Sequence, residues 1–284
     1  MTLGTSASES LSAAGNIFVG QTEAPLLVRP FMPEMTDSEI FCVMAGGFAT
    51  IAGGVLGLFI AIGIDPVALV AASIMSAPAA LAISKVMLPE DEDSKTAPGK
   101  KGAFEIPDSG HSNIVHAAAD GAVIGTTLLL NIAGNLIAFL AFLKMFDELI
   151  IYLGTRVDID IDLNKLLGWL FYPAAWLMGI PGEDCELAGT LLATKVFSNE
   201  LIAYQLMLFE FRADLSERTF YILSYALCGF SNFGSIGIQL GGLSPMAGPE
   251  KAPVLAKYVF AAMIAGNTAC WMTACIAGIF YEEE

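Results

Sequence analysis

Two glutamates, Glu23 and Glu200, each lie about midway along an otherwise apolar stretch of the sequence. A carboxylate inside a bilayer costs roughly 2.5–3.5 kcal/mol on insertion scales, so such a residue is expected to face a cavity or a partner. A structural alternative for Glu200 is an ion pair with Lys195, five residues earlier. Hydrogen-bonding side chains flank both glutamates: Gln21, Thr22, Ser198 and Asn199. We therefore interpret both carboxylates as candidate ligands for a small polar solute or a cation.

Two longer apolar stretches are interrupted in their interiors by small and polar residues. The stretch 40–64 contains two glycine pairs and Thr50, and the stretch 219–249 contains Asn232 and Ser235. Interrupted apolar segments in two corresponding halves of a chain indicate the binding site of a transporter, because unwound backbone exposes carbonyls and helix ends. The alternative for each neutral polar residue is a hydrogen bond between helices, which is the commoner use in membranes.

The sequence shows no motif of a soluble enzyme. It has no Walker A sequence, no GxGxxG and no HExxH, and its five cysteines have no metal-ligand spacing. We expect no enzyme activity and no cofactor, and transport would be driven by an ion gradient. An intramembrane protease that uses Glu23 and Glu200 together is kept as an alternative.

Composition indicates how these residues are positioned. The 284 residues are 55% hydrophobic and only 15% charged. About 20 apolar residues span a bilayer as a helix, and five stretches close to or beyond this length lack Asp, Glu, Lys and Arg: 40–64, 66–84, 121–143, 219–249 and 258–281. The sequence therefore predicts an all-α integral membrane protein. A net charge of −16 argues against a nucleic-acid partner.

The order of the segments predicts two inverted repeats, each with a re-entrant hairpin, a broken helix and a plain helix. The first repeat, 1–88, would contain a hairpin at 5–32, a broken helix at 39–64 and a helix at 66–88. The second repeat, 186–284, would contain a hairpin at 187–213, a broken helix at 216–243 and a helix at 252–281. A hydrophilic loop, 89–112, and a region with a long scaffold helix and an interfacial helix, 113–185, would lie between them.

At these segments the sequence resembles the concentrative nucleoside transporter family. The strings that carry the resemblance are ESLSAAGNIFVGQTEAPLL, GGFATIAGGVLG, SIMSAPAALAISK, TKVFSNELIAY and LCGFSNFGSIGIQLGGLSP. The resemblance implies a homotrimeric, multi-pass plasma-membrane protein that carries nucleosides by symport with sodium, or with protons.

The resemblance also implies roles for particular residues. The nucleobase would contact Gln21, Thr22, Glu23 and Val55. The ribose would contact Glu200, Asn232 and Ser235, with Phe230 lining the site. A sodium ion would be bound by Asn16, Val19, Thr50 and Ile51, mainly through carbonyl and other neutral oxygens.

One departure from the family is that its members have further scaffold helices before the first hairpin. We therefore expect this chain to be the C-terminal part of such a transporter, as a fragment or a truncated form. The alternatives are a transporter or channel for another small polar solute, and a non-transporting subunit.

Overall fold

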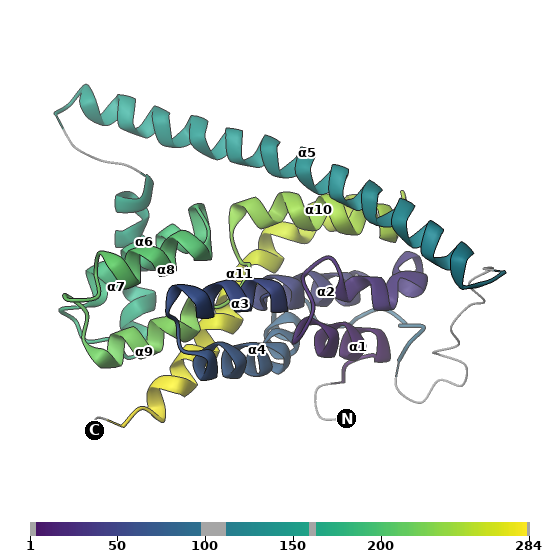
Figure 1. Ribbon diagram of the computed structural model, residues 1–284, viewed down its shortest axis with the longest axis horizontal. Coiled ribbons are helices and arrows are strands. Elements are labelled where there is room, and N and C mark those ends of the chain that lie inside the picture. Colours follow the sequence, from purple (N-terminus) through teal and green to yellow (C-terminus); the bar gives the residue numbers. More distant parts are fainter. Residues whose placement is uncertain (1–3, 98–111, 159–162, 283–284) are drawn as a thin grey trace.

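The computed structural model describes residues 4–97, 112–158 and 163–282, and within these ranges all regular structure is helical, as predicted (Figure 1). Four segments are long and apolar enough to cross a membrane. They are Asp37–Ile62, Pro66–Met87, Ile114–Asn131 and Ala252–Ile279. The chain is therefore a multi-pass helical membrane protein, which confirms the predicted class.

The chain begins with two short helices, α1 (Ala7–Asn16) and η1 (Ala24–Glu34). A capping box starts α1, because the Ser6 side chain accepts from the Glu9 N–H and the Glu9 carboxylate accepts from the Ser6 N–H. The element η1 is a 3₁₀-helix, whereas the sequence suggested two ordinary short helices. Its interior prolines explain the difference, because a proline lacks the N–H that an α-helical hydrogen bond requires.

An apolar helix then runs in two pieces, α2 (Asp37–Ala49) and α3 (Gly53–Ile62). The interruption consists of residues 50–52, where Thr50 and Ala52 have extended backbone angles. It falls between the two glycine pairs, which are themselves helical. The next helix, α4 (Pro66–Met87), starts at a proline behind the capping side chain of Asp65.

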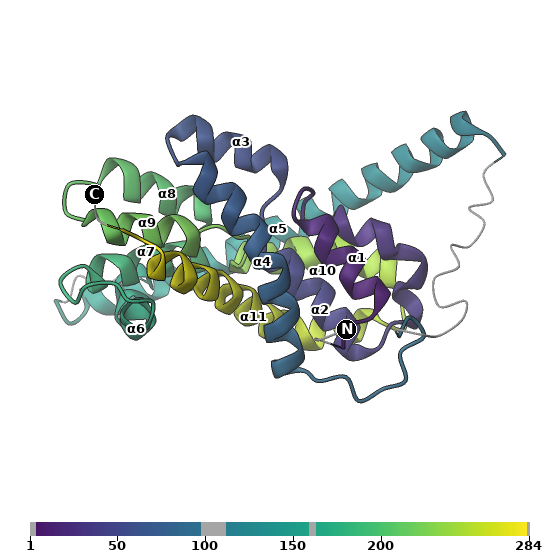
Figure 2. The ribbon, with the colours of Figure 1, turned by 90° about the horizontal axis from the view of Figure 1, so that it is seen from below.

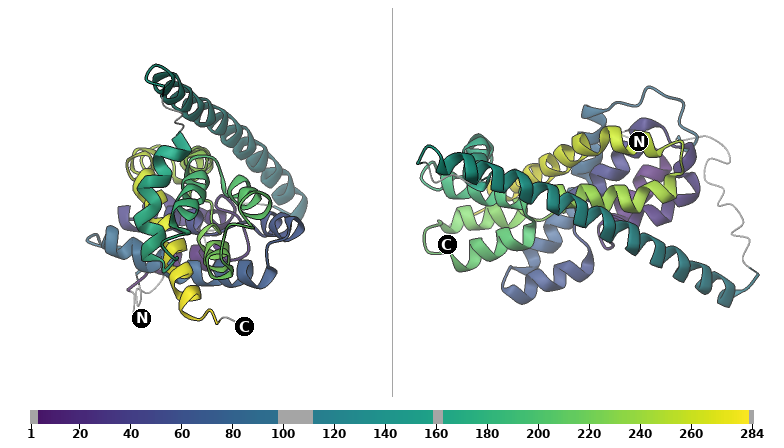
Figure 3. Two further views of the ribbon diagram at one scale, coloured as in Figure 1. Left: turned by 90° about the vertical axis from the view of Figure 1, so that its left-hand side faces the viewer. Right: turned by 90° about the horizontal axis from the view of Figure 1, so that it is seen from above.

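Two helices connect the halves of the chain. α5 (Ile114–Thr155) extends beyond the predicted hydrophobic stretch and runs along one side of the bundle beside α10 (Figure 1, Figure 3). α6 (Leu163–Leu177) packs against α7. Many large apolar side chains of α5, such as Leu129 and Leu130, are exposed, which suits a surface in contact with lipid or with another subunit.

The last part of the chain repeats the order of the first. Two short helices, a helix in two pieces and a long helix follow each other: α7 (Cys185–Phe197), α8 (Glu200–Phe209), α9 (Glu217–Ala226), α10 (Phe233–Ala247) and α11 (Ala252–Ile279). α11 packs against α2, α4 and α9 through the middle of the molecule (Figure 2). This packing brings the interruption between α2 and α3 next to the interruption between α9 and α10.

Candidate binding site

A cleft of about 450 Å³ opens between α3, α8 and the first turns of α10. Its lining residues are Gln21, Val55, Leu58, Phe59, Ser198, Asn199, Glu200, Leu201, Phe230, Asn232, Gly234, Ser235 and Ile238. Apolar walls with a few convergent polar groups, and a volume between 300 and 1,000 Å³, are typical of small-molecule sites. Six of the eight residues predicted to bind the solute are in this lining: Gln21, Val55, Glu200, Phe230, Asn232 and Ser235.

Glu200 is the acidic group of the cleft. It is the first residue of α8, where the positive end of the helix dipole favours a carboxylate, and its Oε2 accepts a hydrogen bond of 2.9 Å from Asn232 Nδ2. Lys195 forms no ion pair within 4 Å of Glu200: its Nζ donates to the carbonyl of Ala226 at 2.9 Å, and its charge acts on Glu200 from a longer distance. The carboxylate is therefore held by a neutral amide, and its other oxygen remains available to a ligand.

Asn232 and Ser235 connect Glu200 to the first half of the chain. Asn232 Oδ1 accepts from the backbone N–H of Ser235 at 2.7 Å and so caps the start of α10. The hydroxyl of Ser235 accepts from Gln21 Nε2 at 3.3 Å, and Gln21 lies in the connection between α1 and η1. The cleft thus joins polar groups that are more than 200 positions apart in the sequence.

Thr22 and Glu23 lie outside the cleft, unlike the other predicted contacts. Glu23 is exposed, and its carboxylate accepts from the hydroxyl of Thr22 at 3.0 Å. The backbone N–H of Glu23 donates to the carbonyl of Gly20, which closes a tight turn. Residues two apart in a helical turn point to different sides, so Gln21 faces the cleft while Glu23 faces away. The structure thus separates the two predicted acids: Glu200 lines the cleft, and Glu23 does not.

The residues predicted to bind sodium lie around the first interruption. Asn16, at the end of α1, is fully buried, and neither its Oδ1 nor its Nδ2 has a hydrogen-bond partner. Thr50 and Ile51 are buried in the interruption itself, whereas Val19 is 39% exposed. The carbonyl of Phe18 accepts from the Gly53 N–H at 3.2 Å, which fastens the connection after α1 to the interruption. A buried amide oxygen without a donor fits a hard cation.

The two interruptions touch through their backbones. The N–H of Phe230 donates to the carbonyl of Thr50 at 3.2 Å. Such closeness requires glycine: a Cβ on Gly229 would lie 3.1 Å from the carbonyl oxygens of Phe48 and Ala49. A Cβ on Gly266 of α11 would overlap the Cβ of Phe48. One backbone hydrogen bond therefore links the residues predicted to bind the cation to the residues that line the cleft.

Gln239 is a site residue that the sequence reading missed. It is buried, its Nε2 donates to the carbonyl of Met44 at 3.2 Å, and its Oε1 has no hydrogen-bond partner. A Cβ on Gly47 would overlap the Gln239 amide and contact Gln21, so this amide lies directly behind the cleft. A signal was present, because Gln239 follows Ser235 by one helical turn on the same face of α10.

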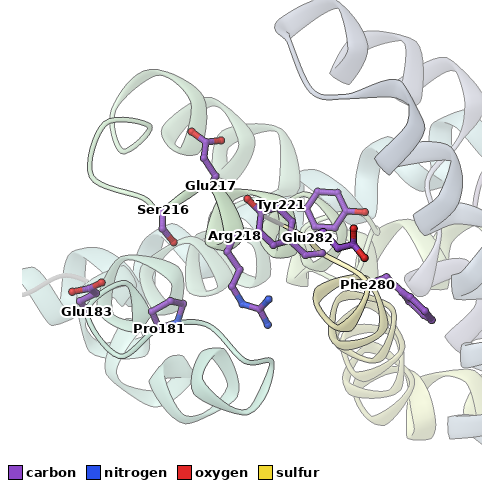
Figure 4. A pocket seen from close by; sticks show the side chains of 9 residues that line it. Pro181, Glu183, Ser216, Glu217, Arg218, Tyr221, Phe280 and Glu282 are labelled. Atoms are coloured by element: carbon purple, nitrogen blue, oxygen red, sulfur yellow. The ribbon is translucent and has the colours of Figure 1, made fainter. Parts of the chain in front are cut away.

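A larger pocket, of about 880 Å³, lies near the C-terminal end of the described chain (Figure 4). Its lining includes Glu183, Glu217, Arg218, Tyr221 and Glu282, and it shares no residue with the cleft. The side chains of Glu183, Glu217 and Glu282 point in different directions in Figure 4. The cleft is the better candidate despite its smaller volume, because it gathers buried polar groups from both halves of the chain.

The fold and the site define a class: a helical membrane protein with a polar cleft and a buried, unpartnered amide where two interrupted helices meet. The sequence model of the family "Na+ dependent nucleoside transporter C-terminus" matches residues 68–278. The chain therefore belongs to the sodium-dependent, concentrative nucleoside transporter family.

Individual relatives agree with this assignment. The chain is 44% identical to sodium/nucleoside cotransporter 1 of Mus musculus, over 99% of this chain and 45% of that protein. It is 44% identical to solute carrier family 28 member 3 of Eptatretus stoutii, over 100% of this chain and 43% of that protein. The chain thus spans less than half the length of these relatives.

Solved structures of the transporter CNTnw share the fold. The inward-facing, substrate-bound state is 42% identical and superposes with a TM-score of 0.77, covering 98% of this chain and 65% of that one. A variant of CNTnw in an outward-facing state is 41% identical and gives a TM-score of 0.86, covering 98% and 66%. The chain therefore superposes better on this outward-facing structure than on the inward-facing one.

Proposed function

We propose that the chain forms the solute- and cation-binding part of a sodium-coupled nucleoside symporter of the plasma membrane, organised as two inverted repeats and assembled as a homotrimer. Proton coupling is the alternative ion gradient. The observation that carries the proposal is the hydrogen-bonded pair Glu200 and Asn232, buried at the edge of a cleft with apolar walls. Two relatives whose names include sodium and nucleoside support the choice of solute and ion.

The chemistry of the pair suits a ribose. A vicinal diol can donate to the carboxylate of Glu200 and accept from the amide of Asn232, so it would exchange the internal bond for two external ones. Hydrogen bonds to a charged acceptor are about twice as strong as neutral ones. The nucleobase would lie against Val55 and Phe230, with Gln21 reading its polar edge.

The cation would bind where Asn16 meets the first interruption. Its unpartnered buried oxygen and the carbonyls of residues 50 and 51 offer neutral oxygen ligands. The Phe230 N–H donates to the Thr50 carbonyl. A cation bound at Thr50 would therefore also order Phe230, which lines the cleft. Binding of cation and nucleoside would then favour each other reciprocally.

Isothermal titration of the purified protein with uridine, adenosine and free ribose, in sodium chloride and in choline chloride, tests the proposal. We expect binding of uridine or adenosine only in sodium, and loss of at least about tenfold in affinity in Glu200→Gln. The matched control is Glu183→Gln, an exposed acid of the other pocket, which should bind as the wild type does.

Unchanged nucleoside affinity in Glu200→Gln would refute the assigned site. Binding of another polar solute in place of nucleosides would favour the runner-up, a transporter or channel for that solute. Cleavage of a peptide in detergent would favour the protease alternative. The mass of the purified complex in detergent tests the homotrimer, and a monomer at working concentration would contradict it.

A further inference from the structure

Among the lysines whose burial the structure describes, Lys195 alone is fully buried, and the proposed transport mechanism does not explain its position. Its side chain is fully buried in α7. An ammonium group is costly to bury without charge compensation or hydrogen bonds. Its Nζ donates to the carbonyl of Ala226 at 2.9 Å, and Ala226 is the last residue of α9. The hydrogen bond to the ammonium therefore comes from the end of an interrupted helix, and the Glu200 carboxylate adds charge compensation from a longer distance.

The C-terminal end of a helix carries a partial negative charge and free carbonyl groups, so it is suited to a cation. The hydroxyl of Tyr204 occupies a second carbonyl of the same turn, that of Ser224, at 2.8 Å. One donor thus comes from α7 and the other from α8. Of the two donors, Lys195 supplies the positive charge.

The first half of the chain has the corresponding helix end without such a lysine. α2 ends at Ala49 just before its interruption, as α9 ends at Ala226 before its own. The same number of residues separates Glu23 from Ala49 and Glu200 from Ala226. Near the end of α2 lies Asn16, whose buried amide has no partner. The Ala226 carbonyl therefore accepts from an ammonium, whereas the Ala49 carbonyl accepts from the neutral thiol of Cys270 at 3.5 Å, and Asn16 beside Gly46 is a neutral side chain without a partner.

We propose that the ammonium of Lys195 is a tethered cation, which takes in the second half of the chain the place that a free cation takes in the first. This inference rests on the proposed function for the first site. It follows that one free cation, rather than two, is needed to order both interruptions. Lys195 is a positioning residue: it holds the end of α9, while Glu200 and Asn232 at the edge of the cleft contact the solute.

The test is Lys195→Gln, which keeps a hydrogen-bond donor for the Ala226 carbonyl and removes only the charge. The thermal unfolding midpoint in detergent is measured against sodium chloride at constant ionic strength, with choline chloride as the replacement and no nucleoside present. We expect the wild type to follow a one-site sodium dependence. The variant should show a lower midpoint without sodium and a steeper dependence that requires a second sodium ion.

Two controls separate charge from packing. Lys195→Arg keeps the charge and should keep the one-site sodium dependence. Tyr204→Phe removes one hydrogen bond from the same helix end without removing charge, so it should lower the midpoint and leave the sodium dependence unchanged. A second variant, Lys195→Met, removes the donor as well and should show the same additional sodium component as Lys195→Gln.

A one-site sodium dependence in both neutral variants would overturn the proposal, as would a steeper dependence in Tyr204→Phe. Uridine titrations add a second readout. At low sodium, Lys195→Gln should bind uridine about tenfold more weakly than the wild type, and high sodium should restore the affinity, within the range of typical coupling energies. A wild type that binds sodium but no nucleoside would refute the proposed function and leave the sodium test of Lys195 intact.

Discussion

Asn232 uses the two ends of its side-chain amide for different purposes: Oδ1 caps α10 and Nδ2 holds Glu200. Asn232→Asp keeps an acceptor for the cap and places a second carboxylate beside Glu200. We expect it to keep the cap of α10 and to lose at least about tenfold in uridine affinity, because it removes the Nδ2 donor and its like charge repels Glu200 in a buried site.

Asn232→Ala is the comparison for this prediction. It removes the cap as well, which costs about 1 kcal/mol, so it should lower the unfolding midpoint in addition to the affinity. Thermal unfolding and titration with uridine measure the two effects separately. Wild-type uridine affinity in Asn232→Asp would contradict the proposed contact.

Asp184 is a second residue whose role can be tested, because it joins the start of α7 to the start of α9. It lies in the connection after α6, outside the four spans, and its Oδ2 accepts from the hydroxyls of Ser216 at 2.6 Å and Thr219 at 2.5 Å. Burial raises the pKa of this carboxyl, but the hydrogen bonds from Ser216 and Thr219 outweigh burial and hold the pKa below its ordinary value.

A carboxyl whose pKa is lowered by folding stabilises the fold above its unfolded pKa, about 3.9, and loses this contribution as the pH falls through the folded-state pKa. We therefore expect Asp184→Asn to lower the stability by about 1–2 kcal/mol at neutral pH. The difference from the wild type should shrink below about pH 4. Unfolding midpoints across this range check the prediction, and a constant difference down to about pH 3 would contradict it.

At the residue scale, the sequence showed which residue types could bind a polar solute, but it did not show which of these side chains face the cleft. An acid within an apolar stretch marked both Glu23 and Glu200, yet only Glu200 lines the cleft. The turn that directs Glu23 outward depends on hydrogen bonds to Gly20, which composition does not reveal. Lys195 was noticed only as a possible partner of Glu200. Its acceptor, the carbonyl of Ala226, has no sequence signal at all.

At the scale of elements, the meeting of the two interruptions depends on Gly266 of α11. Gly266→Ala should destabilise the protein by about 1–3 kcal/mol, because the new methyl group would overlap Phe48 in a close-packed crossing. Gly57→Ala is the matched control. Nothing lies within 4 Å of a Cβ on Gly57 in α3, so alanine there should be neutral or stabilising by up to about 1 kcal/mol.

Thermal unfolding of both variants decides this prediction. Equal midpoints for Gly266→Ala and Gly57→Ala would show that the crossing tolerates a side chain, and the close contact of the interruptions would then be wrong.

The elements themselves were only partly predictable. Apolar length identified the spans, because every residue of such a stretch contributes to the signal. The end of α2 was harder to predict, since Gly46 and Gly47 are still helical and the backbone becomes extended only at Thr50. Glycine permits a break but does not require one. The contact that opens the helix here is made by residues far away in the sequence, including Phe230.

At the scale of the whole molecule, the first part of the hydrophilic connection is fastened to the bundle. The buried carboxylate of Glu39 accepts from the hydroxyls of Ser94 at 2.6 Å and Thr96 at 2.9 Å. Between them, Lys95 is 64% exposed. We expect trypsin to cut slowly after Lys95 in the wild type and at least several-fold faster in Glu39→Gln, because both hydroxyls donate to Oε1 and a neutral amide oxygen accepts such hydrogen bonds more weakly than a carboxylate.

The control is Glu34→Gln, which removes the exposed ion-pair partner of Lys95 and should leave the cleavage rate nearly unchanged. Mass spectrometry of the timed digests identifies the cut. Equal rates in Glu39→Gln and the wild type would show that this segment is not held by Glu39.

The class, a helical membrane protein, was predictable because the hydropathy signal comes from every apolar stretch of the chain. The family was predictable from the resemblance. The arrangement of the halves was not predictable in the same way. That α11 packs between α2 and α9, or that α5 lies along α10, depends on small residues and shape rather than on composition.

The contact between the two interruptions has an evolutionary consequence. Phe48 fills the space beside Gly266, and the carbonyls of Phe48 and Ala49 fill the space beside Gly229, so a larger residue at either glycine would disturb the contact that the Thr50–Phe230 hydrogen bond spans. Among relatives of this protein, a larger residue at position 266 should appear only together with a smaller one at position 48, whereas position 229 should remain glycine because backbone carbonyls and Cys270 surround it.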